Sequence, residues 1–125
     1  MPDLSRRSLQ AELMDNLDCE GKVVEQTLYE LDVINKWLGG NAVTLNGLKK
    51  LLDNSTVPIQ IVDIGCGSGE MLKKINHHYN SRSIFLTGID ANPNIVALAQ
   101  RHTGNVSNIQ LICENILTES FYQKN

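Results

Sequence analysis

A glycine-rich junction at residues 62–70 constrains the fold of this chain more than any other segment. An apolar, largely β-branched run over 59–64 ends there, and a segment with helical spacing begins. Such a short run predicts a strand covered on both faces of a parallel sheet. Glycines at positions 65, 67 and 69 remove three Cβ atoms from one turn, so the backbone can adopt positive φ and a ligand can approach it closely. The junction therefore predicts a strand, a tight turn with a ligand, and a helix from about Gly69.

Two further strands are predicted downstream, over 84–89 and 109–113. Between them, Asn92 can cap a helix and Pro93 can occupy its first turn. Strands that alternate with helices in this order predict an α/β fold with a Rossmann-like parallel sheet, in which ligands bind beyond the carboxyl ends of the strands.

Amphipathic helices are predicted before the sheet. Leucines recur four apart over 4–17, and apolar residues recur at three and four spacing over 22–38, which Gly39-Gly40 would end with a left-handed turn. Thr44 can cap a third helix, whose leucines share one face. The α/β unit is therefore preceded by a helical region.

Composition excludes several classes of function. A net charge of -3 provides no basic surface for a phosphate backbone, so no nucleic-acid partner is indicated. No apolar run approaches the roughly 20 residues of a membrane span, and we expect no signal peptide, because a continuous apolar core after a basic start is missing from this sequence. The three cysteines are far apart in sequence and form no CxxC pair, which argues against a disulfide framework and a metal site. We expect a cytoplasmic protein without a membrane partner.

Polar residues follow each predicted strand at its carboxyl end. Asp63 and the glycine turn close the first strand, Asp90 closes the second, and Glu114 and Asn115 follow the third. Free backbone N–H groups at the turn favour a polar or anionic group. A carboxylate at the tip of the second strand can accept hydrogen bonds from both hydroxyls of a ribose, so a ribose-containing ligand is predicted at Asp90.

The spacing of the glycines favours some ribose ligands over others. A dinucleotide fold requires GxGxxG, but its third glycine would fall at Glu70. A carboxylate there would repel a pyrophosphate and attract an amino or sulfonium group. An NAD- or FAD-dependent oxidoreductase is therefore disfavoured, although it stays an alternative.

The segment VDIGCGSGE at 62–70, together with GID at 88–90, resembles the first two motifs of class I S-adenosylmethionine-dependent methyltransferases. The resemblance implies a methyl transfer from S-adenosyl-L-methionine to an acceptor by in-line displacement, in which proximity and alignment carry most of the catalysis. It also implies that Gly65, Gly67 and Gly69 pack against the methionine part of the cofactor. Asp90 would bind the ribose and Asp63 would fix the turn.

The same resemblance implies where the adenine lies. Ala91 and Asn92 would flank the ring, while Glu114 and Asn115 would contact it from the end of the third strand. The implied cofactor-binding set is Asp63, Gly65, Cys66, Gly67, Gly69, Asp90, Ala91, Asn92, Glu114 and Asn115.

The resemblance divides the chain into an N-terminal helical cover over 1–56 and a partial S-adenosylmethionine-binding α/β domain over 57–125. The cover resembles that of methyltransferases whose small-molecule or lipid-like substrates lie under an N-terminal cover. Tyr29 and Trp37 either line this cover or pack on their own helix face, and the second interpretation is favoured.

The family's sheet has seven strands, whereas this chain supplies three and ends where a fourth should begin, near 121–125. We therefore expect a truncated, inactive fragment, whose catalytic residues lie beyond Asn125 and stay unknown. Its exposed sheet edge would favour a homodimer. A non-catalytic adenosyl-binding or scaffold domain is the remaining alternative.

Overall fold

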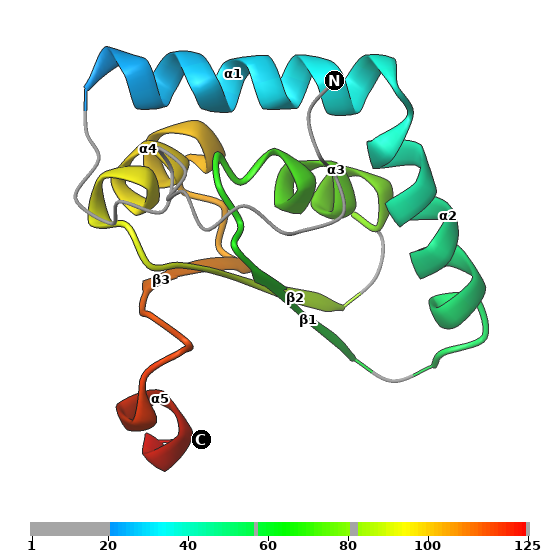
Figure 1. Cartoon of the computed structure of the whole chain (residues 1–125). Coiled ribbons are helices and arrows are strands. Elements are labelled where there is room, and N and C mark those ends of the chain that lie inside the picture. Colours follow the sequence, from blue (N-terminus) through cyan, green and yellow to red (C-terminus); the bar gives the residue numbers. More distant parts are fainter. Residues whose placement is uncertain (1–20, 57, 81–82, 125) are drawn as a thin grey trace, which may run out of the picture.

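The computed structural model describes residues 21–56, 58–80 and 83–124, and the helix predicted over 4–17 lies outside them. Two helices come first and three strands alternate with helices after them (Figure 1). The elements are α1 (Lys22–Trp37), α2 (Gly40–Leu52), β1 (Ile59–Ile64), α3 (Glu70–His78), β2 (Ile84–Asp90), α4 (Pro93–Thr103), β3 (Ile109–Cys113) and α5 (Glu119–Lys124).

The three predicted strands are confirmed and form one parallel sheet in the order β1-β2-β3. Ile59 pairs with Ile84 at one end, and Asp90 pairs with Cys113 at the other. Figure 1 shows α3 and α4 on one face of this sheet, with α1 above them. Because the strands are parallel, their carboxyl ends meet along the same edge, beneath α1.

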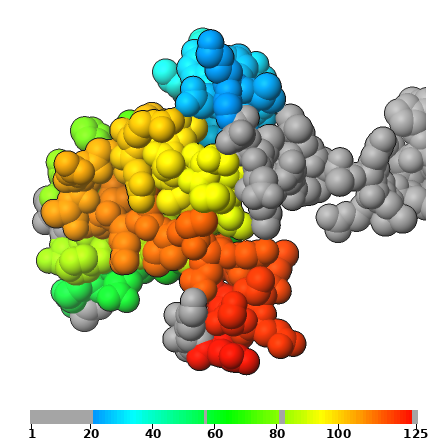
Figure 2. All heavy atoms as spheres, turned by 90° about the vertical axis from the view of Figure 1, so that its left-hand side faces the viewer, coloured from blue at the N-terminus to red at the C-terminus, as the bar shows by residue number. Residues whose placement is uncertain are grey.

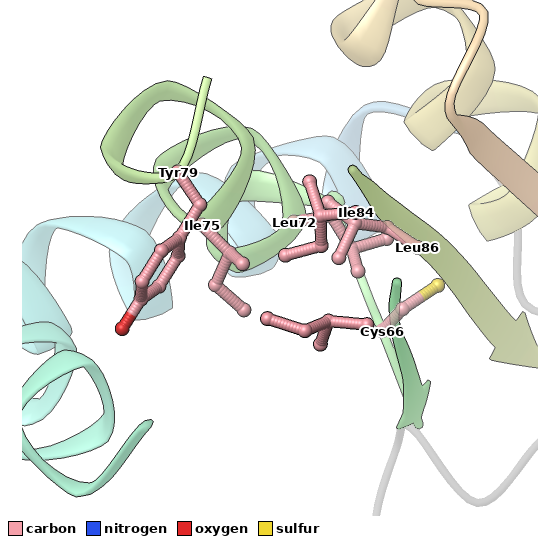
Figure 3. Close-up of a cluster of buried hydrophobic side chains, with 7 residues drawn as sticks. Cys66, Leu72, Ile75, Tyr79, Ile84 and Leu86 are labelled. Atoms are coloured by element: carbon pink, nitrogen blue, oxygen red, sulfur yellow. The ribbon is translucent and has the colours of Figure 1, made fainter. Parts of the chain in front are cut away.

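The main core lies between α3 and the covered face of the sheet (Figure 3). Leu72 and Ile75 of α3 pack against Leu86 of β2, and all three are almost completely buried. Gly88 permits this close approach, since a Cβ there would lie 2.7 Å from the Leu72 Cδ1 atom and 2.9 Å from the Cys66 sulfur. A side chain at this strand position would collide with the core.

The opposite face of the sheet is open in the described part of the chain. Val62 and Ile64 of β1 and Phe85 of β2 are each more than half exposed. The expectation that β1 is covered on both faces is therefore wrong here. Both helices that connect the strands lie on the same side, so the better-buried side chains of β1 are those that point to that side.

The predicted helix over 22–38 is confirmed as α1, but α2 begins earlier than expected. Gly39 adopts a left-handed conformation with φ of 79°, and α2 starts at the next residue. Thr44 is consequently inside the helix and not its cap, and its hydroxyl donates to the Gly40 carbonyl. One left-handed glycine is enough to end one helix and redirect the chain into another.

Only the first half of the apolar stripe on α1 is buried. Val24 and Leu28 pack with Ile95 of α4, whereas Leu38 is 81% exposed. Figure 2 shows the start of α1 seated above α4. Trp37 is also 81% exposed, so it does not pack on its own helix face as the favoured interpretation held.

The segment after β3 differs from expectation. A fourth strand was expected to begin near 121–125, but Glu119–Lys124 form the short helix α5. Side-chain hydrogen bonds stabilise the turn that leads into α5, because the Thr118 hydroxyl donates to the Asn115 carbonyl and also contacts the Ser120 hydroxyl. Among the described residues, no helix is long and apolar enough to cross a membrane.

Candidate functional site

The glycine turn between β1 and α3 is tied to the end of the neighbouring strand. The backbone N–H groups of Gly65 and Cys66 both donate to the Ile89 carbonyl, at 2.7 and 3.1 Å. Gly65, Gly67 and Gly69 all have positive φ, between 53° and 76°. This geometry requires residues without a Cβ and fixes the turn against the tip of β2.

The turn is also in contact with the helices on either side of it. A Cβ at Gly69 would lie 2.8 Å from the Thr103 Cγ2 atom of α4, and one at Gly67 would lie 3.5 Å from the Leu28 Cδ2 atom of α1. At Gly65, by contrast, a Cβ would meet no atom within 4 Å. The first glycine therefore faces open space, a Cβ at the second would make only an ordinary van der Waals contact, and the third serves packing as well as backbone conformation.

Asp90 ends β2 and turns its carboxylate toward the glycine turn. Its Oδ2 accepts a hydrogen bond from the Gly67 N–H at 3.3 Å, and its Oδ1 accepts one from the Asn92 N–H at 3.1 Å. An ionised carboxylate has about four lone-pair positions, so each oxygen keeps capacity for another donor. The side chain is thus held in place while it can still accept hydrogen bonds from a ligand.

Asn92 is the N-cap of α4, as predicted from Asn92-Pro93. Its Oδ1 accepts from the Asn94 N–H at 2.9 Å, and the residue is 3% exposed. This cap positions the start of α4 directly after Asp90. The local sequence therefore fixes both the strand tip and the helix that follows it.

Burial changes the acidity of two groups at the turn. Burial raises the pKa of Asp63 above its ordinary value. Burial also raises the pKa of the Cys66 thiol to about 12, with a further contribution from the carboxylates of Asp90 and Asp63. The thiol is consequently protonated at neutral pH, which argues against a nucleophilic role.

The turn opens into a cavity of about 570 Å³, within the usual size range of small-molecule sites. Five of the ten predicted residues line it, namely Asp63, Gly65, Cys66, Gly67 and Asp90. The other five, which are Gly69, Ala91, Asn92, Glu114 and Asn115, do not.

Glu114 and Asn115 lie beside the site without facing the cavity. The Glu114 N–H donates to the Asp90 carbonyl at 3.0 Å, and the Asn115 Oδ1 accepts from the Leu117 N–H at 3.0 Å. Both residues support the chain around the strand tips in this structure. Their proposed contacts with adenine stay a prediction.

Glu70 does not act as the free charge assumed from the sequence. Its carboxylate pairs with Lys74 at 3.1 Å and with Lys73 at 3.7 Å, and His102 lies 3.7 Å away. The two lysines on α3 counter its charge locally. The spacing of the glycines, more than the charge of Glu70, is therefore the sequence feature that separates this turn from a dinucleotide site.

Sequence reasoning missed the wall of the cavity that α1 and α2 provide. Asp32 is central to it, because its Oδ2 accepts a hydrogen bond from the Ser68 hydroxyl at 2.7 Å. Asp32 lies four residues after the buried Leu28, so helical spacing already put it on the same face. The lining residues that were not predicted are Leu28, Leu31, Asp32, Asn35, Asn41, Thr44, Ser68, Glu70, Met71 and Ile95.

A smaller cavity of about 330 Å³ lies between α1 and α4. It shares Leu28, Asp32 and Ser68 with the larger one, so the hydrogen bond between Asp32 and Ser68 lies in the wall that divides them. Tyr29 lines this smaller cavity, and the ion pair of Arg101 with Glu25 closes one side at 3.1 Å. Within the described ranges, no cluster of His, Cys, Asp or Glu is arranged to hold a metal ion.

Comparisons with known proteins agree with this geometry. Residues 61–125, more than half of the chain, match the family described as "Methyltransferase domain". No curated protein matches the chain.

The chain is similar to parts of longer proteins of known structure. The plantazolicin methyltransferase BpumL, in complex with a triazolic desmethylPZN analog and SAH, is similar with 24% identity and a TM-score of 0.54, covering 76% of this chain and 34% of that chain. The plantazolicin methyltransferase BamL, in complex with the same analog and SAH, is similar with 24% identity and a TM-score of 0.54. The match covers 82% of this chain and 35% of that chain. An S-adenosylmethionine-dependent methyltransferase from Thiobacillus denitrificans, in complex with S-adenosyl-L-homocysteine, has 27% identity and a TM-score of 0.42. The match covers 58% of this chain and 29% of that chain.

This chain thus spans about a third of the length of the two plantazolicin methyltransferases. The family match, the order of the strands and the position of the glycine turn all point to one assignment. The chain belongs to the methyltransferase domain family, and its three parallel strands have the Rossmann-like fold of S-adenosylmethionine-dependent methyltransferases.

Proposed function

We propose that the larger cavity binds S-adenosylmethionine and that the protein takes part in methyl transfer to a small-molecule acceptor. The observation that carries the proposal is the Asp90 carboxylate, held by the Gly67 and Asn92 N–H groups at the edge of the cavity. A ribose offers two adjacent hydroxyl donors to such a carboxylate. The open space at Gly65 lets a ligand reach the backbone beside it.

The residues of the turn fit the rest of the cofactor. Gly65 and Gly67 would face the chain that joins the ribose to the amino acid, and Asp63 supports the turn from the end of β1. Ala91, Asn92, Glu114 and Asn115 follow the tips of β2 and β3, where the adenine would extend from the ribose. Gly69 would act through packing on α4 and not through contact.

When bound, S-adenosylmethionine supplies a methyl group on a sulfonium, which a nucleophile displaces in line. The protein's contribution would be to hold the cofactor and acceptor in alignment and to exclude water. The Cys66 thiol borders the cavity, and its high pKa keeps it protonated. It therefore would not compete with the acceptor for the methyl group.

Isothermal titration calorimetry with S-adenosylmethionine, S-adenosylhomocysteine and NAD tests the proposal. We expect the two adenosyl ligands to bind, and Asp90→Asn to weaken both by about 10- to 100-fold, as loss of hydrogen bonds to a charged acceptor predicts. Glu119→Gln on exposed α5 removes the same charge away from the cavity and serves as the control. Binding of NAD alone, or equal affinities for Asp90→Asn and the native chain, would contradict the proposal.

We also propose that two copies of the chain associate through the free edge of β1. Among the described residues, that strand pairs with β2 alone, and Val62 and Ile64 on it are exposed. Unpaired edges of this kind favour strand addition. Sedimentation equilibrium at micromolar concentration should show a dimer, and Val62→Lys should shift it to monomer; a native chain that stays monomeric would refute the association.

A further inference from the structure

The smaller cavity, of about 330 Å³, has no role in the proposed binding of S-adenosylmethionine. Its walls come from α1, the glycine turn and α4, and Figure 2 shows the start of α1 above α4. The lining residues are Glu25, Leu28, Tyr29, Asp32, Ser68, Leu98, Arg101 and His102. The volume lies at the lower end of the range for small-molecule sites, so the cavity is large enough for a ligand of its own.

Two leucines and a tyrosine give the smaller cavity an apolar part. Leu28 is 6% exposed and belongs to a buried cluster, against which Leu98 of α4 packs. Tyr29 follows Leu28 on α1 and is 65% exposed, so its ring is open to both the cavity and solvent. The apolar body of a ligand would lie against these side chains.

The basic groups on the wall of the smaller cavity already have partners. The Arg101 guanidinium lies 3.1 Å from the Glu25 carboxylate. The His102 Nδ1 atom lies 3.0 Å from the Ser68 carbonyl oxygen, which can only accept, so Nδ1 carries the hydrogen and Nε2 carries none in the neutral ring. A proton on Nε2 would be countered by Glu70, which is 3.7 Å away. Neither basic side chain therefore leaves a free positive charge in the cavity.

Asp32 is the acid on this wall whose charge has no counterpart. Its Oδ2 accepts a hydrogen bond from the neutral Ser68 hydroxyl at 2.7 Å. Among the described residues, no Lys, Arg or His forms an ion pair with Asp32, and its Oδ1 has no hydrogen-bond partner. The side chain is partly buried where the two cavities meet. A carboxylate withdrawn from water in this way is stabilised by a bound cation.

The spacing of residues on α1 places an aromatic ring beside the acids. Glu25, Tyr29 and Asp32 are four and three residues apart, so they are neighbours along one face of the helix. An ammonium group is attracted to the face of an aromatic ring. Two carboxylates against one guanidinium also leave the wall with one negative charge when His102 is neutral. The smaller cavity is therefore suited to a cation and not to an anion.

We propose that the smaller cavity binds a small primary amine with an apolar body about the size of one ring. The ammonium group would donate to Asp32 beside the ring of Tyr29, and the apolar body would pack on Leu28 and Leu98. Because the hydrogen bond between Asp32 and Ser68 ties α1 to the glycine turn, the amine would bind directly against this link. The site is separate from the larger cavity, and the proposal does not depend on what that cavity binds.

An NMR titration of the whole chain with three related compounds tests the proposal. The compounds are 2-phenylethylamine, the uncharged 2-phenylethanol and the anionic 3-phenylpropanoate. We expect 2-phenylethylamine to bind with a Kd of about 1 mM or tighter, as its number of atoms allows. The alcohol should bind at least about tenfold more weakly, because it lacks the charged donor, and the carboxylate should bind no better than the alcohol.

Three substitutions on the charged wall test the role of Asp32. Asp32→Asn keeps an oxygen that can accept from Ser68 but removes the charge, and should weaken 2-phenylethylamine by at least about tenfold. Arg101→Gln should act in the opposite direction, tightening the amine by up to about fivefold, because it frees Glu25 from its exposed ion pair. Glu30→Gln is the matched control, since Glu30 is exposed on α1 and lines neither cavity. It should leave the affinity unchanged.

Two further variants show which cavity the amine occupies. Leu98 lines the smaller cavity and not the larger one, so Leu98→Ala should weaken 2-phenylethylamine by about threefold or more through lost apolar contact. Asp90 lines the larger cavity and not the smaller one, so Asp90→Asn should leave the affinity for the amine unchanged. Thermal unfolding monitored by circular dichroism confirms that each variant is folded.

Several results would overturn the proposal. The folded native chain could fail to bind 2-phenylethylamine at millimolar concentration, or it could bind the amine and the alcohol equally, which would show that Asp32 does not recognise the charge. Weakening by Asp90→Asn together with no effect of Leu98→Ala would place the amine in the larger cavity. Since S-adenosylmethionine is not used in this experiment, each of these failures leaves the proposed function intact.

Discussion

Substitution of Gly69 by alanine should destabilise the fold through its left-handed backbone conformation and through a steric contact with α4. Gly69 has φ of 76° and ψ of 9°, and an added Cβ would lie 2.8 Å from the Thr103 Cγ2 atom and 3.7 Å from the Ala99 Cβ atom. The left-handed conformation costs about 1–2 kcal/mol for a residue with a Cβ. Overpacking against α4 adds about 1–3 kcal/mol.

Gly39 is a matched control for the backbone part of this effect. It also precedes a helix, with φ of 79° and ψ of 11°, but a Cβ there would meet no atom within 4 Å. Gly39→Ala should therefore lower the free energy of unfolding by the conformational cost alone, about 1–2 kcal/mol. The difference between the two variants isolates the contact with α4.

The contact can be removed without disturbing its surroundings. Thr103→Ser deletes the Cγ2 atom and keeps the hydroxyl that donates to the Ala99 carbonyl at 2.9 Å. In a double-mutant cycle measured by urea unfolding, Gly69→Ala combined with Thr103→Ser should recover most of the overpacking energy, giving a coupling of about 1–3 kcal/mol. Equal losses for Gly69→Ala and Gly39→Ala, or additive effects in the cycle, would refute the steric reasoning.

Three further predictions concern the core, a helix cap and a thiol. Gly88→Ala should lower the free energy of unfolding by about 1–3 kcal/mol through overpacking, measured by urea unfolding, whereas an unchanged midpoint would mean that the core relaxes around the methyl group. Asn92→Ala removes the N-cap of α4 and should cost about 1 kcal/mol in the same assay, while Asn92→Ser should restore most of it. Because the pKa of Cys66 rises from 9.0 to about 12 in the folded state, its contribution to stability is present below pH 9 and is lost as the pH rises toward 12. Alkylation at pH 8, mapped by mass spectrometry, should therefore modify exposed Cys113 and spare Cys66, and equal labelling in the folded protein would contradict this.

Local signals predicted the sheet and its tips. The apolar run over 59–64, the Asn92-Pro93 pair and the acid that ends the second strand each depend on a few adjacent residues, and the structure has β1, the cap of α4 and Asp90 where they were predicted. The positive φ angles of the three glycines also follow from the spacing of glycine in the turn. These features need no knowledge of the rest of the fold.

Features that depend on how distant segments pack could not be predicted in the same way. Whether Asp32 faces the cavity depends on where α1 lies on the α/β unit, and the sequence around Asp32 contains no signal for that position. The exposure of Leu38 has the same cause, since an apolar stripe is buried only as far as another surface covers it. The pairing of Glu70 with Lys73 and Lys74 could have been predicted from their spacing on one helix, whereas the approach of His102 from α4 depends on how the two helices pack.

The open face of the sheet has a thermodynamic consequence. Val62, Ile64 and Phe85 are already in contact with water in the folded state, so unfolding exposes less new apolar surface on these strands than it would in a sheet covered on both sides. The slope of unfolding free energy against denaturant and the heat capacity of unfolding both scale with newly exposed surface. Both quantities will therefore be low for a chain of this length, and any molecule that covers this face will raise them together.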